Sequence, residues 1–429
     1  MYAPPQTCIA ERTLPAPLLK ASIPSLKRTN MQFIRSLSVG LQLTSRFYRE
    51  ELLAIVKDTG ALLILFLALI IYPLIYGLAY KKEVLQEVPV ALVDLDGTAT
   101  SRQVARMVDA TEELHLSRQA PSLKEAEGLF YAGEVNAVLV LPEAFEQDIM
   151  AGKHTQVGIY SDAAYFLLYK QSMMGALQAV GTFSGGVEVR RLLASGLPME
   201  QALRQRDPVA LRTTLLFNPS GGYNSFVVPG LLLVIIQQTL LIGIGLLGGT
   251  DRERGRFRFA VPGALHKGGI VPVVLGKAGA YLSLYLLNLV ITQVWVYHWF
   301  SLPDKTSWLP ALALMLPFLL AVIFLGMALS TFFARREHSI LFVVFLSPLV
   351  LFLTGLSWPA SAIPSWLQTL AHVFPSTTMV PAWLRVRTMG AGMEHIGPAL
   401  GFLLVQALLY FLLTLLAYYR VARRQTKQP

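Results

Sequence analysis

The residue types best suited to chemistry lie in the stretch ALVDLDGTATS, at residues 91–101. A hydrophobic strand that ends in Asp-x-Asp-Gly-Thr brings two carboxylates to one end of a sheet. Such a pair can transfer a phosphoryl group: Asp94 would attack phosphorus and Asp96 would act as acid and base, with magnesium between them. The same residues also suit a strand–turn–helix corner, in which Asp and Gly shape the turn and Ser or Thr caps the helix.

The sequence that follows favours the structural interpretation. The motif resembles the nucleophile motif of haloacid-dehalogenase-like phosphatases, whose chemistry also needs a later acidic cluster for the metal and a lysine for the phosphoryl group. No Gly-Asp-x-x-x-Asp follows, and the later aspartates of this region are scattered: Asp109, Asp148, Asp162 and Asp207. A membrane-anchored, phosphatase-like hydrolase that uses Asp94 and Asp96 is therefore kept only as an alternative function.

Other cofactor and metal motifs are absent from the sequence. The two Gly-Lys pairs, Gly152-Lys153 and Gly276-Lys277, are not followed by Ser or Thr, so neither forms a P-loop for ATP. There is no His-Glu-x-x-His motif, and the single cysteine, Cys8, allows no disulfide within the chain. We therefore expect this chain to hold no cofactor or metal and to have no catalytic residues of its own.

The composition is that of a membrane protein. Of the 429 residues, 54% are hydrophobic and only 14% are charged, whereas about a quarter of the residues in soluble domains are charged. A helix needs about 20 apolar residues to cross a bilayer. Six segments reach or nearly reach that length: 59–80, 226–250, 278–300, 308–334, 339–358 and 396–419.

Lysines and arginines beside the spans predict how the chain is oriented. They cluster before the first span, between the second and third, between the fourth and fifth, and after the sixth. An even number of spans puts all four clusters, and both termini, on the cytoplasmic side. The tryptophans then fall at or beyond the opposite ends of the spans, as in an aromatic belt: Trp295, Trp299, Trp308, Trp358, Trp366 and Trp383.

The net charge of +10 is unevenly divided. Residues 81–226 hold 13 lysines and arginines and 17 acids, a net charge of −4, while the rest of the chain holds 23 and 9, a net charge of +14. Because the basic excess lies beside the spans, its expected partner is the anionic lipid of the bilayer and not a nucleic acid.

The predicted fold is an α-helical polytopic membrane protein with six transmembrane helices and an inserted α/β extracytoplasmic domain. Strand and helix patterns alternate in the inserted part, with strands at 88–96, 136–141 and 157–162 and helices at 100–111, 122–134, 142–153 and 164–196. The predicted division of the chain is a disordered N-terminal extension at 1–30, a cytoplasmic amphipathic segment at 31–58, the first transmembrane helix at 59–80, the extracytoplasmic domain at 81–225, a five-helix transmembrane region at 226–420 and a cytoplasmic tail at 421–429.

Two connections between spans of the five-helix region have an unusual length or composition. The stretch 250–277 is the longest cytoplasmic loop and the richest in charge, which suggests a docking surface for a partner that drives the protein. The stretch 359–395 is apolar but broken by prolines, so we expect short interfacial or re-entrant helices on the outer side.

Polar residues inside the predicted spans are few. Gln237, Gln238, Asn288 and Gln293 could line a polar pathway, or they could form hydrogen bonds between helices. The predicted spans contain no Asp, Glu, Lys or Arg. Since ion-coupled carriers usually need an ionisable group there, the energy for any transport is expected to come from elsewhere.

The order of several motifs resembles the type-2 family of ABC transporter permeases, in the subgroup with a large extracytoplasmic domain after the first span. The resemblance covers about residues 31–425. It rests on the following stretches: LVDLDGTATSRQVARMVDAT at 92–111, NPSGGYNSFVVPGLL at 218–232, RERG at 252–255 followed by Pro262 and by LGK at 275–277, and TGLSWPASAIPSWLQTLAHVFPST at 354–377. This chain departs from the family pattern after RERG, where it has Arg256 and Arg258 instead of a threonine and an acid.

The resemblance implies the permease subunit of an ATP-driven exporter of drugs or other amphipathic small molecules in the bacterial inner membrane. Its implied partners are cytoplasmic ABC ATPases that bind the ATP and magnesium, a second permease copy or a paralogue, and a periplasmic membrane-fusion adaptor. A non-transporting membrane scaffold is a further alternative. The resemblance assigns ATPase coupling to these residues: Glu253, Arg254, Gly255, Pro262, Gly276 and Lys277.

Overall fold

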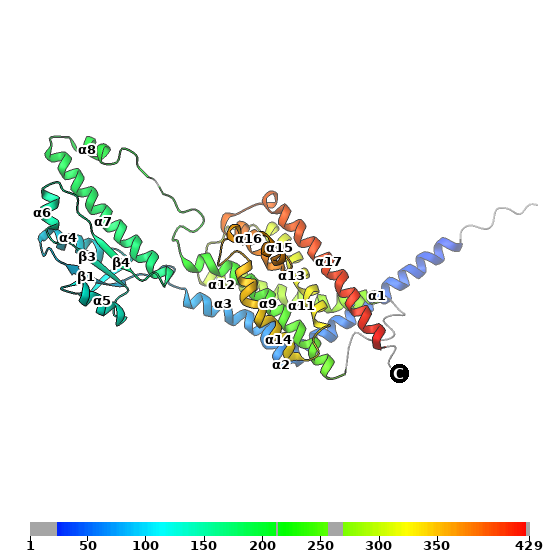
Figure 1. Cartoon of the computed structure of the whole chain (residues 1–429). Helices are drawn as coiled ribbons and strands as arrows, with labels where there is room; N and C mark the ends of the chain where they lie inside the picture. Colours follow the sequence, from blue (N-terminus) through cyan, green and yellow to red (C-terminus); the bar gives the residue numbers. More distant parts are fainter. Residues whose placement is uncertain (1–23, 212, 256–268, 426–429) are drawn as a thin grey trace, which may run out of the picture. The chain divides into compact units, whose positions relative to one another are not determined.

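The computed structural model describes residues 24–211, 213–255 and 269–425. The chain divides into two compact units, one formed by Met1–Gly77 and Val227–Pro429 and the other by Leu78–Phe226. The first unit is helical, and the second contains a sheet (Figure 1). A single α/β unit is thus inserted into a helical one, which matches the order of elements predicted from the sequence.

Six helices of the described residues are long and apolar enough to cross a membrane, in agreement with the six predicted spans. Three of these spans are each one α-helix: α9 (Tyr223–Glu253), α13 (Trp308–Ser330) and α14 (Arg336–Leu353). Two contain a π-helical turn: the first comprises α2 (Thr59–Leu62), η1 (Leu63–Leu67) and α3 (Ala68–Ala79), and the third comprises α11 (Val271–Val290), η2 (Ile291–Trp295) and α12 (Val296–Trp299). The sixth span lies in α17 (Met393–Gln425).

The helices extend beyond the predicted apolar segments. Helix α9 continues to Glu253 and α11 begins at Val271, so both ends of the predicted loop at 250–277 are helical. Pro272 lies in the first turn of α11, where a missing backbone N–H costs nothing. Hydropathy marks the apolar core of a helix and not its ends, so the prediction placed these helix ends too far inward.

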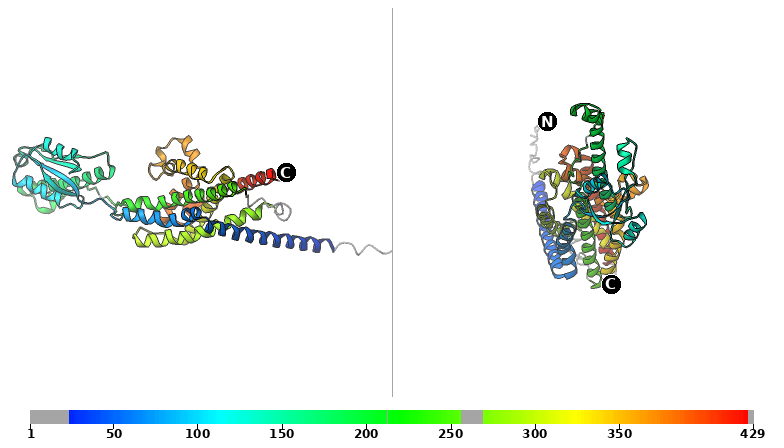
Figure 2. Two further views of the ribbon diagram at one scale, coloured as in Figure 1. Left: turned by 90° about the horizontal axis from the view of Figure 1, so that it is seen from below. Right: turned by 90° about the vertical axis from the view of Figure 1, so that its left-hand side faces the viewer.

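The N-terminal segment differs from its prediction in a similar way. A single helix, α1 (Pro24–Lys57), spans 34 residues and begins inside the stretch predicted to be disordered. Asp58 separates α1 from α2, because its side chain caps the new helix by accepting a hydrogen bond from the Ala61 N–H at 3.1 Å. Figure 2 shows α1 lying alongside the third span, and the contacts between α1 and α11 are extensive.

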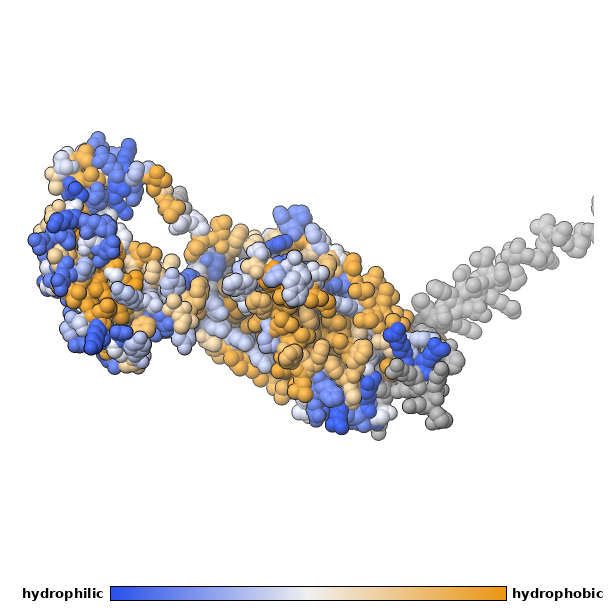
Figure 3. Space-filling view, in the orientation of Figure 1, coloured by the Kyte–Doolittle hydropathy of each residue, from blue (hydrophilic) through white to orange (hydrophobic). Residues whose placement is uncertain are grey.

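Helices α9 and α13 form the core of the helical unit, with hydrophobic side chains buried on most sides of each. Helices α3, α14 and α17 instead expose large side chains such as Ile75, Phe345 and Leu408. Hydrophobic residues accordingly cover much of the face of this unit in Figure 3. Such a surface fits lipid or a membrane-embedded partner and does not fit water.

Three short helices precede the last span: η3 (Ala360–Ala362), α15 (Ser365–Ala371) and α16 (Pro375–Met389). They agree with the short helices predicted for 359–395, except that α17 has already begun at Met393. Helix α16 is not superficial, because Met379, Val380 and Trp383 are buried and the helix packs against α13 and α17. An apolar but proline-broken sequence has thus become part of the core.

The α/β unit contains a four-stranded sheet in the order β2-β1-β3-β4. Its strands are β1 (Val88–Asp94), β2 (Leu114–Gln119), β3 (Ala137–Leu141) and β4 (Gly158–Ser161). Strands β2, β1 and β3 are parallel, and β4 is antiparallel to β3. Strand β2 was not predicted, because its sequence LHLSRQ is polar and only Leu114 is buried, as suits the edge of a sheet.

Helices cover both faces of this sheet. They are α4 (Ala99–Asp109), α5 (Leu123–Tyr131), α6 (Phe145–Met150), α7 (Phe166–Ala194) and α8 (Met199–Arg206). Val104 of α4 and Phe183 of α7 share one hydrophobic cluster, while Ala126 of α5 belongs to another with Val93 and Val138. Residues that alternate along β1 therefore enter two separate cores.

The chain enters and leaves the α/β unit side by side. The Glu83 carboxylate accepts hydrogen bonds from the Ser225 backbone N–H at 3.1 Å and from its hydroxyl at 2.7 Å. The Asn218 side chain closes the turn before it by donating to the Gly222 carbonyl at 2.8 Å. The stretch NPSGGYNS thus forms a tight turn locked to the start of the unit, which explains its Asn, Ser and Gly residues.

Candidate functional site

Asp94 and Asp96 lie at the end of β1, where they form the corner that leads into α4. One Asp94 oxygen accepts hydrogen bonds from the backbone N–H groups of Asp96 at 3.1 Å and Gly97 at 2.9 Å. Its other oxygen accepts from the Ser101 hydroxyl at 2.8 Å. Asp96 accepts hydrogen bonds from the Thr98 hydroxyl and from the Glu146 N–H. Both carboxylates are therefore engaged in turn and cap geometry.

The surroundings of this corner offer little for phosphoryl transfer. No group of three or more His, Cys, Asp or Glu side chains within the described part of the chain is arranged to hold a metal ion. Gly97 has a φ of +63°, which the tight turn requires and which glycine adopts without strain. The arrangement supports the strand–turn–helix interpretation of this motif.

Five of the six residues assigned to coupling fall into two separate places. Glu253, Arg254 and Gly255 lie at the C-terminal end of α9, where Gly255 has a φ of +62° and ends the helix. Gly276 and Lys277 lie in the second turn of α11, and both are buried. Pro262 lies outside the described residues.

The end of α9 is tied to its neighbours by polar contacts. The Glu253 carboxylate accepts a hydrogen bond at 2.9 Å from the backbone N–H of Arg336, at the start of α14. The Arg336 side chain lies 3.4 Å from the Asp58 carboxylate that caps α2. Arg252 donates to the Thr331 carbonyl at 2.5 Å. One end of the α9, α13 and α14 helices is thus held together, while the side chain of Arg254 is exposed.

Gly276 and Lys277 instead join α11 to α1. Phe47, Glu51 and Ile55 lie four residues apart on α1, so they form a single stripe that faces α11, and all three are buried. A Cβ atom at Gly276 would lie 2.6 Å from the Thr44 carbonyl oxygen, so only glycine allows this close approach. The two helices are therefore in backbone contact at this point.

A charged pair is buried in the same place. The Lys277 ammonium donates to the Glu51 carboxylate at 2.5 Å, and the side chains are only 7% and 5% exposed. Tyr281, one turn further along α11, donates to the second Glu51 oxygen. We call Glu51, Lys277 and Tyr281 the α1–α11 seam. Since Lys277 lies inside the third span, the expectation of spans without ionisable residues is corrected here.

The four polar candidates of the spans are all buried, and they have different surroundings. Gln237 accepts a hydrogen bond from the Ser376 N–H at 2.9 Å, at the start of α16. Asn288 donates to the Leu65 carbonyl at 3.1 Å, inside the π-helical turn η1. The side chains of Gln238 and Gln293 have no hydrogen-bond partner among the described residues. Gln237 and Asn288 thus form hydrogen bonds between helices, which is one of the two roles predicted for them.

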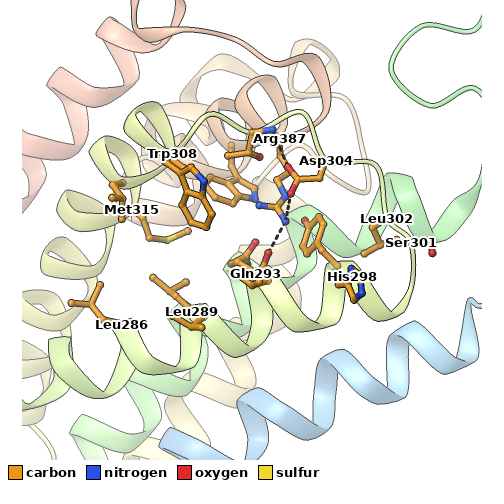
Figure 4. A pocket seen from close by; sticks show the side chains of 17 residues that line it. Leu286, Leu289, Gln293, His298, Ser301, Leu302, Asp304, Trp308, Met315 and Arg387 are labelled. Carbon is orange, nitrogen blue, oxygen red and sulfur yellow. Dashed lines mark hydrogen bonds and ion pairs between the residues drawn. The ribbon is translucent and has the colours of Figure 1, made fainter.

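Gln293 lines a cavity of about 840 Å³ inside the helical unit (Figure 4). The walls come from α11, η2 and α12 on one side and from α13 and α16 on the other. Leu286, Leu289 and Met315 make the apolar part, and Trp308 and Trp383 add aromatic surface. Its volume lies in the range of small-molecule sites.

Arg387 of α16 forms the polar end of this cavity and is only 4% exposed. It donates to the Gln293 carbonyl at 2.7 Å and forms an ion pair with Asp304 at 3.1 Å. Its guanidinium lies 3.5 Å from the centre of the Tyr297 ring, a cation–π arrangement. The carbonyl that it binds belongs to the π-helical turn η2, and such turns often occur at functional sites.

Sequence reasoning did not single out Arg387 or Asp304. Arg387 follows a long apolar stretch and lies in a helix too short to span a membrane, while Asp304 lies in the loop between α12 and α13. Their 83-residue separation gives no signal in one sequence. The only available hint was an arginine, with Arg385 two residues before it, in a segment that is otherwise apolar.

Comparison with known families agrees with this architecture. The model of the ABC-2 family transporter protein matches residues 60–416, which include all six spans for most of their length and the whole α/β unit. The chain belongs to this family. An ABC-2 family transporter protein is a membrane component of an ABC transporter, which supports the prediction of a permease subunit over that of a hydrolase. No curated protein matches the chain.

We predict that Asp94→Asn has only a small effect on this ABC-2 protein. The remaining amide oxygen still accepts from the two backbone N–H groups, and only the bond from Ser101 is lost. The free energy of unfolding should fall by about 0.5–1.5 kcal/mol, measured by denaturant unfolding of the purified protein. Asp162→Asn, which keeps its backbone bond to Ala164, should have no effect. A magnesium-dependent phosphatase activity that Asp94→Asn abolishes would overturn the interpretation.

A second prediction concerns the α1–α11 seam. Lys277→Met should lower the free energy of unfolding by about 3–5 kcal/mol, because it leaves the Glu51 carboxylate buried without its partner. Adding Glu51→Gln should restore much of that loss, since the buried charge is then gone. A double-mutant cycle in detergent measures the coupling between the two side chains. Additive effects of the two substitutions would show that the pair does not interact.

A third prediction compares two glycines of α11. Gly276→Ala should destabilise the protein by about 1–3 kcal/mol, because its Cβ meets the backbone of α1. Gly279→Ala is the matched control: the nearest atom to its Cβ is a ring carbon of Tyr48 at 3.4 Å, so it should be neutral or slightly stabilising. Equal thermal stability of the two variants would contradict the close contact of α1 and α11.

Proposed function

We propose that this ABC-2 protein is the membrane-spanning half of an ATP-driven exporter of amphipathic small molecules. The observation that carries this proposal is the α1–α11 seam. A helix that precedes the first span is fixed to the third span by a buried ion pair and by backbone contact at Gly276. A push on α1 is therefore transmitted directly to a helix of the transmembrane core.

The side of the membrane from which that push comes follows from the proposed topology. The positive-inside rule puts both termini and the α9–α11 connection in the cytoplasm, and it puts the α/β unit outside. The membrane would be the inner membrane of a bacterium. In this topology α1 and the end of α9 are both available to a cytoplasmic ATPase, which binds the ATP and magnesium that this chain has no motif for.

The charges near the α9–α11 connection suit such a partner. Arg252 and Glu253 bind neighbouring helices, whereas the side chain of Arg254 is exposed. Arg256 and Arg258 follow in the sequence, so this connection carries positive charge. An ATPase surface that is acidic at the docking groove would complement it.

Three further parts of the proposal concern the assembly and its cargo. The exposed apolar faces of α14 and α17 suit lipid and a second copy of the chain or a paralogue. The α/β unit is available for a periplasmic adaptor. The largely apolar cavity beside Arg387 suits an amphipathic cargo.

Co-purification tests the proposal. The chain should be co-expressed with a candidate ABC ATPase, and the ATPase bound to the detergent-solubilised chain should be measured. Arg254→Glu should reduce the bound ATPase by about tenfold, because reversed charge in a docking surface costs over about 1.4 kcal/mol. Arg420→Glu makes the same charge change at an exposed site of α17 and should not reduce it.

The contrary outcomes are clear. If the unmodified chain captures no ATPase, or if Arg254→Glu and Arg420→Glu behave alike, the docking part of the proposal is wrong. Transport into vesicles that continues in the absence of any ATPase would refute ATP-driven export altogether.

A further inference from the structure

The cavity beside Arg387 combines an apolar body with one strongly polar end. Leu286 and Leu289 of α11 and Met315 of α13 line the apolar part. Figure 4 shows Arg387, Asp304 and Gln293 close together, with the two dashed interactions of Arg387 converging on this end. A molecule that fills such a space must itself have an apolar body and a single polar head.

Hydrogen-bond donors without partners identify the kind of head. The polar atoms of this end that have no hydrogen-bond partner within the described residues are both atoms of the Gln293 amide, the Nε–H of Arg387, the indole N–H of Trp383 and the hydroxyls of Tyr297 and Thr306. Gln293 is 8% exposed, Trp383 2% and Arg387 4%. Leaving such buried groups unpaired is unfavourable. Because donors predominate and one donor is a permanent cation, the missing partner is a group rich in oxygen acceptors.

The exposure of Asp304 shows that the polar end of the cavity can be reached by water. Asp304 is the only carboxylate among the residues that line the cavity, and its side chain is 43% exposed, in contrast to the buried Arg387. Because the carboxylate side of this ion pair is open to water, an anion that reaches Arg387 from the cavity can compete with Asp304.

We propose that this cavity binds the head group of an acidic amphiphile, a carboxylate or a phosphate, with its oxygens on Arg387 and the Gln293 amide. The hydrocarbon part lies along Leu286, Leu289 and Met315. That this amphiphile is the transported cargo rests on the proposed export function. Its binding to the cavity requires no ATPase. The head group could belong to a free amphiphile or to an anionic lipid.

Binding to the purified full-length chain tests this inference. The protein is placed in nanodiscs of phosphatidylcholine and titrated with dansyl-labelled undecanoate, and energy transfer from tryptophan to dansyl is recorded, since Trp308 and Trp383 line the cavity. The methyl ester of the same probe is the neutral comparison. We expect saturable binding of the acid that is about tenfold or more tighter than that of the ester.

Two substitutions should act in opposite directions. Asp304→Asn removes the competing carboxylate and should tighten binding of the acid by about two- to fivefold. Gln293→Leu removes the amide and should weaken it by about fivefold or more. Glu394→Gln is the matched control, because it removes an exposed carboxylate that does not line the cavity, and it should change nothing.

The sign of the Asp304→Asn effect is decisive. If Asp304 only positioned Arg387, its loss would weaken binding or leave it unchanged, and either result would overturn the inference. Equal binding of the acid and the ester would also overturn it. Gln293→Leu serves as a second variant if Asp304→Asn fails to fold.

Nanodiscs that contain phosphatidylglycerol distinguish the two sources of the head group. If this lipid competes with the probe, an anionic lipid head group is a ligand of the site. If it does not compete, the ligand is a free amphiphile. Arg387 and Gln293 bind the acidic head group in both cases. Since no ATPase is present, a failure here leaves the exporter proposal standing. A failure of ATPase capture, in turn, leaves this binding result standing.

Discussion

A lysine and a glutamate buried together hold the helix before the first span against the third span. Two charges can lie in an apolar environment only if each compensates the other and their remaining hydrogen-bonding groups are satisfied. Lys277 meets Glu51 at 2.5 Å, and Tyr281 supplies the second hydrogen bond to the carboxylate. The pair therefore fixes the register of α1 on α11 more strictly than hydrophobic contact alone would. Sliding α1 by one turn would separate the charges and leave both buried.

The same constraint organises the other polar groups of the helical unit. Three buried polar side chains join two elements each: Asn288 joins α11 to η1, Gln237 joins α9 to α16, and Arg387 joins α16 to η2. Two of these three bonds end on a carbonyl inside a π-helical turn. A π turn shifts the carbonyls out of the regular helical pattern, so it presents an acceptor to a neighbouring helix without breaking the span. Polar residues and π turns thus occur together for a common reason.

Much of this architecture could be predicted from the sequence, because it depends on local patterns. Six apolar segments predicted six spans, and the Asp-x-Asp-Gly-Thr stretch predicted a corner between a strand and a helix, which Asp94 and Thr98 form. What could not be predicted depends on distant pairs. Lys277 looked like part of a loop because its partner, Glu51, lies 226 residues away. Arg387 was not predicted because Gln293 comes from another helix and Asp304 from a loop, and no single sequence shows that they meet.

The seam and the cavity lie on the same continuous helical span. Lys277 and Gln293 are 16 residues apart along Val271–Trp299, which corresponds to about 24 Å of helix. A rigid helix carries a displacement from one end to the other, whereas a π turn is a place where the hydrogen-bond pattern can change at small cost. Here the π turn lies at the cavity and not at the seam. Under the proposed coupling, a displacement of α1 would be transmitted along α11 as far as the π turn. The structure would change there, where the Gln293 carbonyl accepts the hydrogen bond from Arg387. An ATPase that moves α1 would therefore alter the geometry of the cavity.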